Sequence, residues 1–266
     1  MTTSAHHTIR SVSLGTIWRM LRYPFVALSA VLIPRMMGDT IYGQYAFFLS
    51  LFVMVDILAD VGITQICGRF LPEIGDDQPR RTRFLYSLLA YGLSVTVVVI
   101  AGCRLVLWFS PTPSFQPGWW PLLVAMLVAT KLEGTLFAFL YGSNQIGRYS
   151  MKELARSAAL LCFVLLLYPA FGLNGAIAGV LGGELLLLAL AVWWTRHDLF
   201  RIAPGIRPGE FKSFWLVGLQ FYVPMLFFGF LQRAGNLFIE TLTGHSEQVA
   251  YYDVANQFLL LTATFL

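Results

Sequence analysis

Residues 151–194 read MKELARSAALLCFVLLLYPAFGLNGAIAGVLGGELLLLALAVWW, and this stretch decides the fold class. It holds two apolar runs, 151–171 and 173–194, separated at Gly172. A helix needs about 20 apolar residues to cross about 30 Å of hydrocarbon, so each run predicts one membrane-spanning helix. Gly175, Gly179 and Gly183 recur every four residues on the second run, which predicts that another helix approaches it closely.

Six further apolar runs of similar length flank this stretch, at roughly 12–34, 42–66, 84–108, 119–142, 211–233 and 249–266. The sequence therefore predicts an all-α, polytopic membrane helical bundle with about eight transmembrane helices. The first run is not a cleavable signal peptide, because Arg19 and Arg22 lie inside it and no small-residue cleavage site follows.

The composition agrees with a membrane protein. Hydrophobic residues make up 57% of the 266 residues and charged residues 12%, against about 25% charged residues in an ordinary globular domain. Lipid must therefore solvate much of the chain. The three cysteines, Cys67, Cys103 and Cys162, are far apart and predict neither a disulfide framework nor a metal site. The net charge of +4 does not indicate nucleic acid as a partner, because the basic residues fall mainly between the apolar runs.

The basic residues predict the orientation of the chain. One set of alternate connectors holds eleven Lys or Arg: the N-terminal tail, 67–83, 143–150 with the adjoining Lys152, and 195–212. The other set holds only Arg35 and Arg233. Because cytoplasmic connectors carry the excess of Lys and Arg, this count places the N-terminus in the cytoplasm.

The order of the runs predicts two lobes. We expect a cytoplasmic tail at 1–11, a six-helix N-terminal lobe at 12–194, a cytoplasmic linker at 195–212, and the first two helices of a second lobe at 213–266. The last run is still apolar at Leu266, without a polar flank. This ending predicts a C-terminally truncated copy of a longer transporter, because the last carbonyl groups would otherwise lack an interface.

Pro24 and Pro224 suggest a weak internal repeat, since each lies about a dozen residues into an aromatic-rich span that starts on the same side. Paired proline-kinked helices in corresponding positions of two halves point to a central binding site in secondary transporters. The alternative is that the two prolines are ordinary kinks, which neighbouring helices repair in many membrane proteins.

Three short segments resemble the opening of bacterial polysaccharide flippases: IYGQYA at 41–46, LADVGI at 58–63 and GRFLPE at 68–73. The segment GLNGA at 172–176 is similar to the same proteins. They form the oligosaccharidyl-lipid branch of the multidrug/oligosaccharidyl-lipid/polysaccharide exporter superfamily, and the resemblance covers essentially the whole chain. Because members usually have two complete lobes, the resemblance implies that this chain is one lobe plus the start of the next.

Eight ionisable side chains lie within the predicted spans: basic Arg19, Arg22, Lys131 and Arg156, and acidic Asp56, Asp60, Glu133 and Glu184. Each costs about 2.5–3.5 kcal/mol at membrane depth, so each needs a partner or a purpose. Depths estimated at about 1.5 Å per residue match Arg19 with Asp60, Arg22 with Asp56, and Lys131 with Glu184. Arg156 and Glu133 are less well matched in depth.

These charges have two interpretations. In the first, they are paired and simply allow polar helices to pack. In the second, the four basic side chains line a hydrated lumen that binds an anionic headgroup such as a lipid diphosphate, because the arginine fork binds phosphate oxygens bidentately. The acidic side chains would then hold the cations when the site is empty, or take up protons or sodium.

Motifs of catalysis are absent from the sequence. It contains no Walker-type glycine loop, His-Glu-x-x-His pattern, dinucleotide fingerprint or nucleophile elbow. We therefore predict no catalytic residues, no metal and no cofactor, and expect an ion gradient or a downstream sink to supply the energy of transport.

The resemblance implies a secondary transporter that flips a lipid-linked oligosaccharide, a polyprenyl-diphosphate glycan, across the bacterial inner membrane for surface polysaccharides such as the O-antigen of lipopolysaccharide. Expected partners are this substrate, membrane lipids, and glycan polymerase or assembly proteins. One alternative is a cation-coupled multidrug antiporter of the same superfamily, which should need acidic residues more than basic ones. Another is a non-transporting membrane scaffold in glycan assembly.

Overall fold

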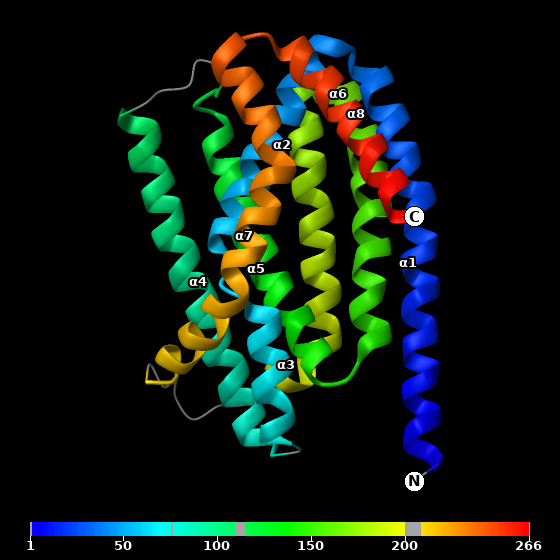
Figure 1. Ribbon diagram of the computed structural model, residues 1–266, viewed down its shortest axis with the longest axis vertical. Coiled ribbons are helices and arrows are strands. Elements are labelled where there is room, and N and C mark those ends of the chain that lie inside the picture. The colour runs from blue at the N-terminus through cyan, green and yellow to red at the C-terminus, as the bar shows by residue number, and fades with distance from the viewer. Residues whose placement is uncertain (1, 76, 110–114, 200–208, 266) are drawn as a thin grey trace.

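The computed structural model describes residues 2–75, 77–109, 115–199 and 209–265 (Figure 1). All its regular elements in these ranges are α-helices: α1 Thr2–Met37, α2 Asp39–Ala59, α3 Ile63–Ile74, α4 Gln78–Phe109, α5 Trp119–Gly142, α6 Ile146–Leu199, α7 Glu210–Thr243 and α8 Ser246–Phe265. Six stretches of them are long and apolar enough to cross a membrane. The predicted all-α, polytopic helical bundle is therefore confirmed.

The connections between helices alternate between two ends of the bundle. The N-terminus, the α3–α4 connection and the α5–α6 turn lie at one end, and the α1–α2 and α7–α8 turns lie at the other (Figure 1). The first end carries most of the basic residues of the connectors, among them Arg69, Arg80, Arg81, Arg83 and Arg148. We call it the basic end and its counterpart the opposite end.

The predicted span 42–66 is wrong as a single helix. The chain breaks after α2 at Asp60, and Gly62, with φ of 72°, begins a new direction that leads into α3. A left-handed backbone costs an L-residue about 1–2 kcal/mol, so glycine is favoured there. A Cβ at Gly62 would also lie 2.9 Å from Cα of Gly218 on α7. The break therefore serves as a contact between α2, α3 and α7.

A test of this contact is the Gly62→Ala substitution. We expect it to lower the free energy of unfolding by at least about 1–2 kcal/mol, because alanine is strained at this φ and collides with α7. Thermal unfolding in detergent measures the change. Gly102→Ala on α4 is the matched control, since nothing lies within 4 Å of its added Cβ. Equal melting temperatures for the two variants would contradict the assigned contact.

Helix α6 contains both runs of the stretch 151–194 and reverses at Gly172, where φ is 58° and ψ is −142°. Its halves lie antiparallel (Figure 1). Added Cβ atoms at Gly175, Gly179 and Gly183 would meet Leu167, Phe163 and Ala159 in turn, so the two halves touch along their length. The close approach predicted from the glycine row is confirmed, and its partner is the first half of the same helix.

Helices α7 and α8 pack along α2. Helix α7 extends to Thr243, ten residues beyond the predicted end of its span at 233. Helix α6 continues to Leu199, into the predicted linker 195–212, and residues 200–208 of that linker lie outside the described residues. Helix α1 begins at Thr2, within the predicted tail. The division into two lobes stays a prediction.

Two apolar clusters hold the helices together, with charged groups between them. One cluster lies around Phe48 and Trp119 and includes Leu127 of α5, and the other lies around Phe137 and includes Leu136 of α5. The intervening segment of α5 carries buried polar side chains, which are Thr130, Lys131, Glu133 and Thr135. We call the ionisable groups at this level the polar layer; it consists of Arg22, Asp56, Lys131, Glu133, Lys152, Glu153, Arg156 and Glu184.

Candidate functional site

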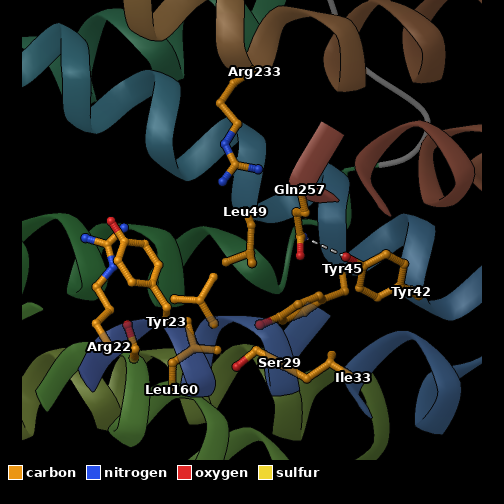
Figure 2. Close-up of a pocket in the computed structure, with 12 residues that line it drawn as sticks. Arg22, Tyr23, Ser29, Ile33, Tyr42, Tyr45, Leu49, Leu160, Arg233 and Gln257 are labelled. Atoms are coloured by element: carbon orange, nitrogen blue, oxygen red, sulfur yellow. Dashed lines mark hydrogen bonds between the residues drawn. The ribbon is translucent and has the colours of Figure 1, made fainter. Parts of the chain in front are cut away.

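A cavity of about 310 Å³ lies where α1, α2, the first half of α6, α7 and α8 meet (Figure 2). Two arginines contribute to its wall from different elements: Arg22 from α1 and Arg233 from α7. Tyrosine, serine and glutamine side chains supply further polar groups, which are Tyr23, Ser29, Tyr42, Tyr45, Ser157 and Gln257. The cavity is therefore a partly open space between helices, and its wall combines apolar side chains with these polar groups.

Arg22 is placed on this wall by the packing of α1 along α6. Its Nη1 lies 2.8 Å from Oε2 of Glu153, and both side chains are partly exposed. The predicted pair of Arg22 with Asp56 is therefore wrong. That prediction assumed that α1 packs chiefly on α2, its neighbour in sequence, whereas α1 makes its main contact with α6.

Arg233 was predicted to lie in a connector between two helices, and this prediction is wrong. Because α7 continues to Thr243, Arg233 lies inside the helix and its side chain reaches toward the cavity (Figure 2). Its Nη1 lies 3.2 Å from Oδ1 of Asp253, a residue of α8 that is 2% exposed. The second cavity arginine is thus also held by a carboxylate.

Asp253 collects donors from three helices. Its Oδ2 accepts hydrogen bonds from the Tyr42 hydroxyl and the Gln257 amide, each at 2.6 Å. Its Oδ1 accepts one from the Asn236 amide at 2.7 Å in addition to Arg233. A buried carboxylate needs such hydrogen bonds in place of its lost hydration, and these bonds fix Asp253 and its neighbours in place.

The polar layer also contains a network of ion pairs around the buried side chain of Glu133. Arg156 contacts Glu133 and, at 2.9 Å, Glu184, while Lys152 lies 3.3 Å from Glu133. The structure thus brings together Arg156 and Glu133, the pair least well matched in depth. Lys131 lies 3.7 Å from Asp56, so its predicted pairing with Glu184 is wrong.

The remaining predicted residues lie apart from this network. Within the described part of the chain, Arg19 and Asp60 form no ion pair, contrary to the prediction: Arg19 is exposed on α1, and Asp60 caps α2 at its break. Pro24 and Pro224 lie inside α1 and α7, and each helix continues past its proline. Neither proline lines the cavity.

Sequence reasoning missed four members of these sites: Lys152, Glu153, Arg233 and Asp253. All four lie near the ends of apolar runs, where a hydropathy count assigns charged residues to connectors. One signal was present, because Lys152, Glu153 and Arg156 recur at spacings of three and four along the start of a predicted helix.

The chemistry of this arrangement suits an anion rather than a metal. Arginine side chains on different walls of one cavity can bind the oxygens of a phosphate or diphosphate group bidentately. Among the described residues, no three His, Cys, Asp or Glu side chains gather as metal ligands.

The sequence profile of the polysaccharide biosynthesis protein family matches residues 9–266. The chain belongs to this family. The match covers nearly the whole chain, including the residues that line the cavity. No curated protein and no solved structure matches the chain.

Proposed function

We propose that this protein flips a lipid-linked oligosaccharide across the membrane and that its cavity receives the anionic diphosphate headgroup. One observation carries the proposal: Arg22 and Arg233, on different helices, line a single cavity inside a bundle of membrane-spanning helices. A charged side chain within a membrane-spanning helix costs free energy, and binding of an anionic cargo would explain why these two arginines are present.

The size and the charge of the cavity support a headgroup site. Ligand pockets usually measure about 300–1,000 Å³, and a cavity of about 310 Å³ suits a headgroup better than a whole glycolipid. The isoprenoid tail would stay in the bilayer during the passage. Without cargo, Glu153 and Asp253 hold the two arginines, which lowers the cost of keeping these charges in the bundle.

The basic end gives the direction of transport in this proposal. Cytoplasmic connectors carry the excess of Lys and Arg, so we propose that the basic end faces the cytoplasm of a bacterium and that the protein resides in its inner membrane. The cargo then enters from the cytoplasmic leaflet and leaves at the opposite end. We propose a transporter that changes no covalent bond, with glycan polymerase or assembly proteins as its partners.

A cation-coupled drug antiporter is less well supported. Such a protein needs an acidic side chain that meets a cationic cargo. The acidic groups next to this cavity, Glu153 and Asp253, are each occupied by an arginine, so a cation would have to displace an arginine first.

Substitution of the cavity arginines in the full-length gene tests the proposal. We expect Arg22→Ala and Arg233→Ala each to reduce flipping at least about tenfold at normal protein abundance, as loss of a charged hydrogen bond worth about 1.5–3 kcal/mol would do. Arg22→Lys should recover only part of the activity, because lysine lacks the bidentate fork. Arg148→Ala is the control, since Arg148 is exposed at the basic end.

The readout is the distribution of the lipid-linked glycan between the two leaflets. Deletion of the gene should strand the precursor on the cytoplasmic face and remove the surface polysaccharide. Normal flipping by both alanine variants would exclude the headgroup site. Unchanged glycan together with heightened sensitivity to cationic dyes would favour the antiporter, and neither phenotype would favour the scaffold.

A further inference from the structure

The cluster around Asp253 joins α2 to α7 and α8 across the opposite end of the bundle. Tyr42 reaches Asp253 from α2, and the Asn236 amide on α7 bridges Asp253 and the Ser50 hydroxyl, at 2.7 and 2.8 Å. Asp253, Asn236 and Ser50 are all buried. A buried polar network with charge-assisted members holds its elements in one arrangement.

A second row of contacts lies further toward the opposite end. The Thr40 hydroxyl donates to Glu247 at 3.1 Å, and the Tyr251 hydroxyl donates to Asp39 at 2.8 Å. Between these two exposed contacts and the buried cluster, a Cβ at Gly43 would collide with the carbonyl oxygen of Ser246. The start of α2 therefore lies directly against the start of α8 at this end.

Arg233 connects this closed end to the cavity. Its side chain is 27% exposed and lines the cavity, whereas the Asp253 side chain that it contacts is 3% exposed. Gln257 and Tyr42 also belong to both the Asp253 cluster and the cavity wall, because they donate hydrogen bonds to Asp253 and line the cavity. A group that binds in the cavity can thus compete with Asp253 for the same guanidinium.

We propose that the Asp253 cluster is a latch that keeps the opposite end closed, and that an anionic group in the cavity releases it by taking Arg233 from Asp253. The release step rests on the proposed headgroup site. Once Arg233 turns to the anion, Asp253 is a buried carboxylate without a cation. Water becomes its best replacement partner, and separation of α8 and α7 from α2 gives Asp253 that access to water.

The latch can be tested by cross-linking across the opposite end. Thr40→Cys and Glu247→Cys place thiols at two positions whose native side chains touch, in a chain whose native cysteines, Cys67, Cys103 and Cys162, are replaced. A short thiol-reactive cross-linker is applied to the purified full-length protein in detergent. Inorganic pyrophosphate serves as the probe anion, and its binding is measured separately by calorimetry.

We expect three results. Saturating pyrophosphate should slow cross-linking at least about fivefold, the lower range of allosteric coupling. Asp253→Asn should slow it without pyrophosphate, and Arg233→Ala should make it insensitive to pyrophosphate. Asp39→Asn is the control, because it removes an exposed contact of the same end, and it should change the rate much less. Tyr42→Phe removes one donor to Asp253 and should loosen the end less than Asp253→Asn, which gives a second test if Asp253→Asn folds poorly.

The outcomes separate the latch from the headgroup site. If pyrophosphate binds but leaves the cross-linking rate unchanged, release by an anion is overturned while the headgroup site stands. If pyrophosphate does not bind at all, the headgroup site and the release step both fail. If neither Asp253→Asn nor Tyr42→Phe slows cross-linking, the cluster does not keep the end closed, whatever the anion does.

Discussion

Arg156→Ala is expected to lower the free energy of unfolding by about 3–5 kcal/mol, the cost of breaking a buried ion pair by removing one partner. Arg156 contacts two carboxylates, and the Glu133 side chain is fully buried while that of Glu184 is 7% exposed. Without the guanidinium, Lys152 is the remaining cation next to Glu133, and Glu184 loses its ion pair.

Thermal unfolding in detergent and the yield of monodisperse protein measure this loss. A combined variant, Arg156→Met with Glu133→Gln and Glu184→Gln, should recover much of the lost stability, because the layer then contains no unpaired carboxylate at these positions. Arg148→Ala, which removes an exposed arginine of the same helix, should melt close to the unmodified protein. A melting temperature for Arg156→Ala close to that of Arg148→Ala would contradict this assignment.

Gly175→Val is expected to separate the two halves of α6 and to cost about 3 kcal/mol, in the upper range for overpacking a core. A Cβ at Gly175 would collide with the backbone oxygen of Leu167 and lie 2.8 Å from Cβ of Phe171. Neither atom belongs to the flexible end of a side chain, so the collision is relieved only by moving the helix backbone.

Gly147→Ala is the matched substitution for this test, because it lies on the same helix and nothing lies within 4 Å of its added Cβ. It should keep its melting temperature or gain slightly, since alanine is the better helix former. If Gly175→Val and Gly147→Ala have the same melting temperature, the two halves of α6 do not touch at Gly175.

Apolar runs in the sequence predicted the existence of the helices well, and charged residues predicted their ends poorly. The runs at 119–142 and 151–194 follow α5 and α6 closely, because lipid-spanning segments must be continuous and apolar. The end of α7 was misplaced at Arg233, since hydropathy alone treats a charged residue as the border of a span. A buried carboxylate such as Asp253 pairs with Arg233 and allows the helix to continue past it. Such a partner becomes known only from the packing of the helices.

The sequence predicted most of the charged residues of the candidate site, but not which of them form ion pairs with one another. Depth along the membrane normal follows from counting residues, which is why most of the polar layer was found. Pairing also needs the neighbour relations of the helices and the direction of each side chain around its helix axis. Arg22 was therefore assigned to Asp56, although α1 packs on α6 and offers Arg22 to Glu153.

The polar layer has a consequence for the response of the protein to membrane voltage. It contains four basic and four acidic side chains in three groups of ion pairs: Arg22 with Glu153, Lys131 with Asp56, and Lys152 and Arg156 with Glu133 and Glu184. An elementary charge that crosses 100 mV gains or loses about 2.3 kcal/mol. A neutral layer that shifts along the membrane normal carries no net charge through this field. A shift of this layer alone would therefore couple weakly to the membrane voltage, whereas an anion bound in the cavity would add a charge on which the voltage acts.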